Sequence, residues 1–266
     1  MMHNHQLPQT GKGMKDSYDA IISLGGDCAA ASQMRMRGMR RCALPFDWTY
    51  MDGPQTIKWL SKGFGDGFAD FCLRENLETL ARDAAPGLAP YRYRDRASGY
   101  NFIHHFWRSI ETEAGYRATY DVLRRRADRL LGIVDRSSAI LFILATDFEY
   151  DTDVATNLLE ALRRLHPSKE IDLHVLQHSV AFSNPCTLAE KWPDRLPFTG
   201  GRYARSMSTY DINRTDAEWE FLDRLSISGL ERKRFKGLES LKYKIWKSLS
   251  KHFRDTGYAA VGIRFD

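Results

Sequence analysis

The chain has few cysteines, and they do not fall into a metal-binding or redox pattern. Cys28, Cys42, Cys72 and Cys186 are scattered through 266 residues, without a Cys-x-x-Cys pair or a Cys and His ligand spacing. Zinc sites and disulfide frameworks depend on such spacings. The sequence therefore predicts no metal site, and a reducing compartment fits it best.

Long apolar runs and the common phosphate-binding motifs are also missing. No segment approaches the roughly 18 apolar residues of a membrane span, and residues 1–17 lack the apolar core of a signal peptide. We expect a cytoplasmic protein with a mobile polar leader at residues 1–17. The turn at Gly25-Gly26 follows neither the GxGxxG nor the GxxxxGK[ST] pattern, and no cofactor is predicted.

The composition offers a large core and an uneven charge. Hydrophobic residues make up 43% of the chain and aromatic residues 12%, which suits a single domain at residues 18–229. The net charge is +5, yet residues 231–254 alone hold nine Lys and Arg residues against two Glu. Apolar residues recur on one side of that segment. We predict a basic amphipathic C-terminal helix within residues 230–266.

This C-terminal segment has two interpretations. Its apolar side can pack on the domain while its lysines stay in solvent, or it can make a peripheral contact with an anionic inner membrane surface. Nucleic acid is not expected as a partner, because the positive charge is confined to one segment and no recognised binding motif accompanies it.

The stretch ISLGGDCAAA predicts a strand, a tight turn and a helix. An apolar run ends at Leu24, Gly25-Gly26 makes the turn, and an alanine-rich segment with high helix propensity follows. Asp27 is suited to cap the helix, which places Cys28 in the first turn, where the helix dipole favours a thiolate. Cys28 is thus a candidate nucleophile. On spacing alone a small packing residue is the more common finding, and the turn could instead cradle a phosphate.

A second pattern sets the fold class. SAILFILAT at residues 138–146 is typical of a strand buried on both faces, and a helical pattern at 152–165 separates it from a strand at 171–177. We predict an α/β fold with a mostly parallel sheet and flanking helices in three layers. The carboxyl ends of the strands would gather Cys28, Asp147 and His178 at one edge. Residues 179–214 read as irregular and suited to a lid.

Two further motifs carry acids and histidines. LPFDW at residues 44–48 places Asp47 between Phe46 and Trp48, where it could orient a catalytic base or simply bond backbone amides. YNFIHHFW at 100–107 predicts a strand whose alternation puts His104 and His105 on opposite faces. One of them could act as an acid or base, or one could pack while the other is exposed.

Together, ISLGGDC at 22–28, LPFDW at 44–48 and FIHHF at 102–106 resemble the bacterial family DUF1796, described as papain-like cysteine peptidases. The likeness covers residues 21–165. It implies that Cys28 is the nucleophile and that the family's histidine falls on His104. His105 stands where the family has an aspartate, so Asp47 and Asp147 remain the candidates for the orienting acid.

The sequence therefore predicts a cysteine-nucleophile hydrolase, either peptidase-like or of a related acyl-transfer type, acting on a peptide, a glycan or another small molecule. Two alternatives stay open. One is a nucleotide-sugar glycosyltransferase of surface-polysaccharide assembly, and the other is a binding module in which Cys28 only packs. The residues expected to contact substrate are Gly25, Gly26, Asp27, Phe46, Trp48 and His178.

Overall fold

The computed structural model describes residues 14–80, 89–181, 189–192, 195–206 and 217–229. Most of the predicted leader and the whole basic segment at 231–254 lie outside these ranges. The predictions of a mobile leader and of a C-terminal helix therefore stay predictions. Within the described ranges, no helix is both long and apolar enough to cross a membrane.

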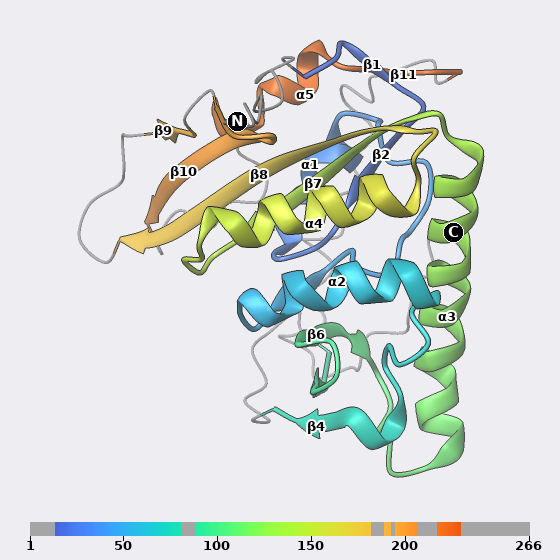
Figure 1. Cartoon of the computed structure of the whole chain (residues 1–266). Coiled ribbons are helices and arrows are strands. Elements are labelled where there is room, and N and C mark those ends of the chain that lie inside the picture. Colours follow the sequence, from blue (N-terminus) through green and yellow to red (C-terminus); the bar gives the residue numbers. More distant parts are fainter. Residues whose placement is uncertain (1–13, 81–88, 182–188, 193–194, 207–216, 230–266) are drawn as a thin grey trace, which may run out of the picture.

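A five-stranded sheet forms the centre of the molecule (Figure 1). Its strand order is β2-β7-β8-β10-β9, and all neighbours pair in parallel except β9, which is antiparallel to β10. The helix α4 makes the crossover between β7 and β8, as the sequence predicts. The bounds are β2 (Ala20–Ser23), β7 (Ala139–Thr146), α4 (Thr152–Leu165), β8 (Glu170–Ala181), β9 (Ala189–Lys191) and β10 (Thr199–Ser206).

The strand β7 is apolar throughout because both of its faces are covered. Alternate residues point to opposite sides of a strand, so Ile140 and Phe142 join the hydrophobic cluster that contains α4, whereas Leu141 and Ile143 join the cluster that contains α1 (Cys28–Met36). Figure 1 shows α4 in front of the sheet and α1 behind it. The parallel part of the fold prediction is thereby confirmed.

A second sheet lies beside the first and was not predicted. It is antiparallel, with the order β3-β6-β5-β4. Of its strands only β6 was predicted; β3, β4 and β5 are shorter, so their hydrophobic period is weak in the sequence. The predicted arrangement of one sheet between two layers of helices does not include this second sheet, and the three-layer arrangement is not confirmed. The bounds are β3 (Thr49–Met51), β4 (Leu77–Thr79), β5 (Tyr91–Asp95) and β6 (Tyr100–Phe106).

Two helices and an aromatic cluster join the sheets. The helix α2 (Pro54–Asp66) packs against α4, and α3 (Glu113–Arg136) runs along one side of the molecule (Figure 1). Phe46 stacks on Tyr100 with ring centroids 4.9 Å apart, and Trp59 packs edge-on against both rings. Aromatic rings of this size carry much of the burial that fixes one sheet against the other.

The segment from 179 to 214, expected to be irregular, contains two strands, and that prediction was wrong for β9 and β10. TGGRYARS at β10 has few apolar residues, so its sequence gives no strand signal. Pairing with β8 holds it in place. Gly200 has φ +118°, and a Cβ there would overlap the carbonyl oxygen of Val175, so only glycine fits this position.

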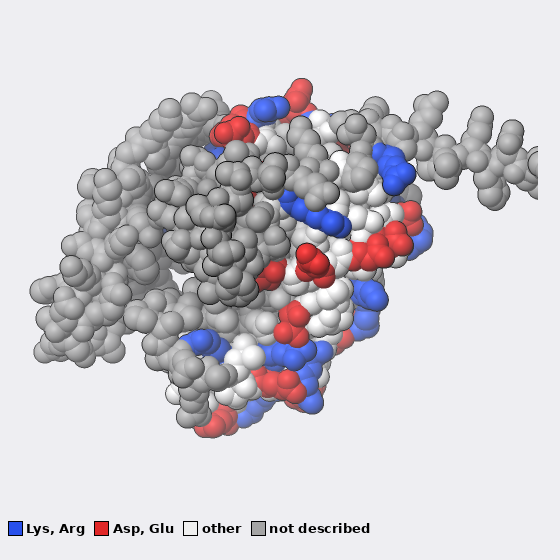
Figure 2. Space-filling view, turned by 90° about the vertical axis from the view of Figure 1, so that its left-hand side faces the viewer, with Lys and Arg blue, Asp and Glu red and all other residues white. Residues whose placement is uncertain are grey.

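The last described residues close one face of the parallel sheet. Trp219 and Leu222 pack in the same hydrophobic cluster as α1. On the face in Figure 2, acidic and basic side chains of the described residues are interspersed. The remaining bounds are β1 (Ser17–Tyr18), which pairs in parallel with β11 (Ser226–Ile227), and η1 (Arg74–Asn76), η3 (Ala217–Trp219) and α5 (Phe221–Arg224).

Candidate functional site

The predicted strand, turn and helix around Cys28 are present. β2 ends at Ser23, Gly25 and Gly26 have φ of +80° and +100°, and α1 begins at Cys28. A Cβ on Gly26 would overlap the carbonyl oxygen of Ala145 in β7. The two glycines are therefore explained by backbone conformation and close packing.

Asp27 caps α1 and is buried. Its Oδ1 accepts a hydrogen bond of 2.7 Å from the backbone N–H of Ala29, and the residue is 2% exposed. This bond satisfies one of the N–H groups that the first turn of a helix leaves without a partner. The capping role predicted from the sequence is confirmed, and it places a carboxylate directly before Cys28.

The Cys28 thiol is buried and neutral. Its Sγ lies 3.6 Å from the hydroxyl oxygen of Tyr50, which is its hydrogen-bond partner in the described part of the chain. Burial raises the pKa of the thiol to about 12; the bond to Tyr50 opposes this rise, and the charge of Asp27 adds to it. The helix dipole alone favours a thiolate, but here the loss of hydration outweighs it.

His178 stands beside Asp27, between two carboxylates. Its Nδ1 lies 3.6 Å from Oδ2 of Asp27, and its Nε2 lies 3.2 Å from Oε2 of Glu218. All three side chains are at least nine-tenths buried, although neither ring nitrogen reaches hydrogen-bond geometry. The carboxyl edge of the parallel sheet thus brings Asp27, and Cys28 next to it, together with His178, as its topology predicts.

Glu218 is the member of this group that the sequence did not reveal. It lies in η3, a short helix with no hydrophobic period, 40 positions after His178. Trp219 packs in the hydrophobic cluster on one face of the parallel sheet, and this packing brings the neighbouring Glu218 to the carboxyl edge. Asp147 follows β7 at the same edge, but its side chain is exposed.

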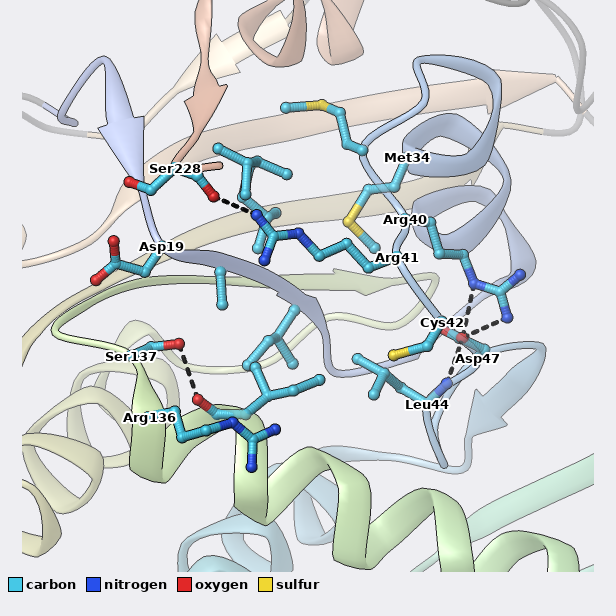
Figure 3. Close-up of a pocket in the computed structure, with 16 residues that line it drawn as sticks. Asp19, Met34, Arg40, Arg41, Cys42, Leu44, Asp47, Arg136, Ser137 and Ser228 are labelled. Atoms are coloured by element: carbon cyan, nitrogen blue, oxygen red, sulfur yellow. Dashed lines mark hydrogen bonds and ion pairs between the residues drawn. The ribbon is translucent and has the colours of Figure 1, made fainter. Parts of the chain in front are cut away.

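Asp47 braces a loop elsewhere in the molecule. Its Oδ2 accepts hydrogen bonds from Arg40 (Nε, 2.9 Å; Nη2, 2.7 Å) and from the backbone N–H of Leu44 (2.8 Å). Burial raises the pKa of this carboxyl, and the charge of Arg40 opposes the rise. Figure 3 shows the pair at a cavity of about 340 Å³ that also holds Cys42 and the amino end of β2.

His104 and His105 line one and the same cavity, of about 420 Å³, on the side of the antiparallel sheet. The regular alternation predicted for this strand does not hold. Tyr91 pairs with Phe106 and Tyr93 with Phe102, so β6 carries extra residues between these pairs and the alternation is interrupted. Burial lowers the pKa of His105 to about 3, helped by the charges of Arg126 and His104.

The remaining predicted residues divide between the core and this cavity. Phe46 is fully buried among aromatic rings. Trp48 has φ +65°, a strained value for a non-glycine residue, and its ring lies edge-on to His104 with centroids 6.5 Å apart. Cys28 does not line the cavity. Among the described residues, no three His, Cys, Asp or Glu side chains are grouped so as to hold a metal ion.

Comparisons with known proteins place these features in a family. No solved structure matches the chain. An uncharacterized protein, R408, of Acanthamoeba polyphaga mimivirus is 29% identical over 187 residues, which cover 66% of this chain and 82% of the viral protein. Residues 19–181 match the model of the family described as "Putative papain-like cysteine peptidase (DUF1796)". The match spans more than half of the sequence, and the chain belongs to this family.

Proposed function

We propose that the protein is a cysteine hydrolase in which Cys28 is the nucleophile and His178 is the base. The observation that carries the proposal is the position of His178. Nε2 lies 3.2 Å from Oε2 of Glu218, and Nδ1 lies 3.6 Å from Oδ2 of Asp27, the residue directly before Cys28 at the start of α1. A nucleophile, a base and an acid that orients the base are the three parts that this chemistry needs.

His104 and His105 fit the role of base less well. His105 is partly buried, and the loss of hydration lowers its pKa to about 3, so it is a weak proton acceptor at neutral pH. His104 belongs to a cavity that Cys28 does not line. The family resemblance that assigns the base to His104 therefore competes with a geometry that favours His178.

The raised pKa of Cys28 determines how the reaction would begin. A thiol with a pKa of about 12 is protonated at pH 7, so it needs a base during the attack and does not rest as a thiolate. As Sγ bonds to the substrate carbonyl carbon, its proton passes to Nδ1 of His178. The negative charge that develops on the carbonyl oxygen would be stabilised by backbone N–H groups of the first turn of α1.

The second half of the reaction restores the thiol. His178 gives its proton to the leaving group, and the C–N or C–O bond of the substrate breaks to leave a thioester on Cys28. A water molecule, deprotonated by Nδ1, then attacks the thioester carbon. The carboxylic acid leaves, and the proton returns to Sγ.

The phosphate-binding alternative receives less support at this edge. The start of α1 would attract an anion, but the carboxylates of Asp27 and Glu218 already lie there, buried beside His178. A phosphate group brought to the same place would face two negative charges in a region of low polarity. No observation favours the glycosyltransferase over the hydrolase.

The test is to trap the thioester. The protein is mixed with p-nitrophenyl acetate at pH 7.5, p-nitrophenol release is followed, and the acetylated peptide is identified by mass spectrometry. We expect a burst of one equivalent, with the acetyl group on Cys28. Cys28→Ala should lose the burst, and the matched variant Cys42→Ala should keep it.

A burst that persists in Cys28→Ala overturns the proposal, and so does acetylation confined to other residues. Absence of any burst from the wild-type protein, whose fold is verified by circular dichroism, also counts against it and favours the binding module.

A further inference from the structure

The cavity beside β6 is a feature that the proposed hydrolase does not use. It has a volume of about 420 Å³, within the range of small-molecule sites. One wall contains His104, His105, Trp107 and Arg108, and the other is formed by α3 residues between Ala118 and Arg126. It contains the two motifs, around Trp48 and around His104, that the reaction at Cys28 leaves unexplained.

The charge of this cavity is positive and is not balanced from within. Arg108 and Arg126 line it, and none of the described residues that line it is acidic. Arg126 is partly buried, which lowers the pKa of its guanidinium, and it forms no ion pair with any carboxylate that the structure describes. The charge of Asp47 raises the pKa of Arg126, opposing the effect of burial. However, Oδ2 of Asp47 already accepts two hydrogen bonds from Arg40.

A partly buried guanidinium without a carboxylate partner has lost part of its hydration and gains no ion pair in return. An anionic ligand would supply the missing partner. Arginine is well suited to this, since its planar group can donate two parallel hydrogen bonds to a phosphate or a carboxylate.

The aromatic side chains of the cavity point to a flat ring on the same ligand. Trp107 is 61% exposed, more than any other large hydrophobic residue in the described part of the chain. Trp48 keeps its positive φ of +65° at the same cavity. Exposed tryptophan faces and strained backbone at a pocket are common where a ring is bound.

From this combination we propose that the cavity binds a small molecule that carries a phosphate or carboxylate on an aromatic ring system. The ring packs against Trp107 and Trp48, and the anionic group pairs with Arg126 and Arg108. The proposal does not depend on Cys28 and would hold if the hydrolase failed its test.

The experiment separates the ring from the charge. Adenosine 5′-monophosphate, adenosine and inorganic phosphate are titrated into the full-length protein by calorimetry, with indole-3-acetate as a carboxylate probe. We expect the two probes that combine a ring with a charge to bind at least about tenfold more tightly than adenosine or phosphate alone, and added salt to weaken them.

Two variants and one control place the binding in this cavity. Arg126→Met and Trp107→Ala should each weaken adenosine 5′-monophosphate by about tenfold or more, whereas Arg125→Met, next to Arg126 on the exposed side of α3, should change it less than about twofold. Trp107 is exposed, so its substitution keeps the test valid if Arg126→Met does not fold. Equal binding by all four proteins, or no saturable binding of any probe, overturns the proposal.

Discussion

The sheet edge at Cys28 and the cavity at Trp107 differ in whether their charged groups have partners of opposite charge within the protein. At the edge, His178 lies between Asp27 and Glu218, and the thiol of Cys28 is uncharged. At the cavity, two arginines lie beside an exposed tryptophan, and no carboxylate of the described residues lines the space. Ionisable groups that lie close together within the protein can pass a proton between them. An arginine without a carboxylate partner can instead bind a ligand that supplies the negative charge. The comparison separates a candidate reaction site from a candidate binding site.

The largest effect is expected from the backbone of the Cys28 edge. Gly26→Ala should lower the free energy of unfolding by more than about 3 kcal/mol, because the new Cβ overlaps the carbonyl oxygen of Ala145 at a φ of +100°. The matched variant Gly65→Ala lies on an exposed position of α2 with its Cβ 3.7 Å from Leu165. It should stabilise the protein by about 0.5 to 1 kcal/mol. Urea unfolding measures both, and equal effects would show that the turn is not tightly packed.

Acid should lower the free energy of unfolding through His105, which lines the cavity. The pKa of His105 is about 3 in the folded protein and 6.5 ordinarily, so below pH 6.5 the unfolded chain takes up a proton that the folded chain does not. The contribution of neutral His105 to the free energy of unfolding is therefore fully present above pH 6.5 and is lost as the pH falls toward 3. Between pH 7 and pH 5 this histidine should cost about 2 kcal/mol. His105→Gln should reduce the difference in unfolding free energy between these two pH values by that amount, and an unchanged difference would contradict the burial of a neutral ring.

A smaller effect concerns the reactivity of the thiols in the free protein. The position of Cys28 at a helix start predicts that it is the fastest thiol to be alkylated, but its burial and raised pKa reverse this expectation. At pH 7 iodoacetamide should modify the half-buried Cys42 before Cys28. The rate at Cys28 should then rise about tenfold per pH unit up to pH 10.

Tyr50→Phe should sharpen this result. It removes a hydrogen bond that lowers the pKa of Cys28, so alkylation at pH 9 should slow by about two- to tenfold. Peptide mapping by mass spectrometry gives the rate at each cysteine. Rapid alkylation of Cys28 at pH 7 would show that the thiol is not held neutral.

The sequence predicted the parts of the molecule that depend on local pattern. The strand, the turn and the helix at Cys28 follow from apolar residues, two glycines and a capping aspartate, and the rule for parallel sheets placed His178 at the same edge. It did not predict Glu218, because only tertiary packing brings η3 to the sheet. It also missed the bulge in β6, which interrupts the alternation used to place the two histidines, and both of them line one cavity.

The central claim, that His178 serves Cys28, is tested by the burst of p-nitrophenol in histidine variants. His178→Gln should slow acetylation of Cys28 by about 100-fold or more, the usual contribution of a general base. His104→Gln should slow it far less, and His166→Gln, at the end of α4, should leave it unchanged. Loss of the burst in His104→Gln with retention in His178→Gln would contradict the account and return the base to His104.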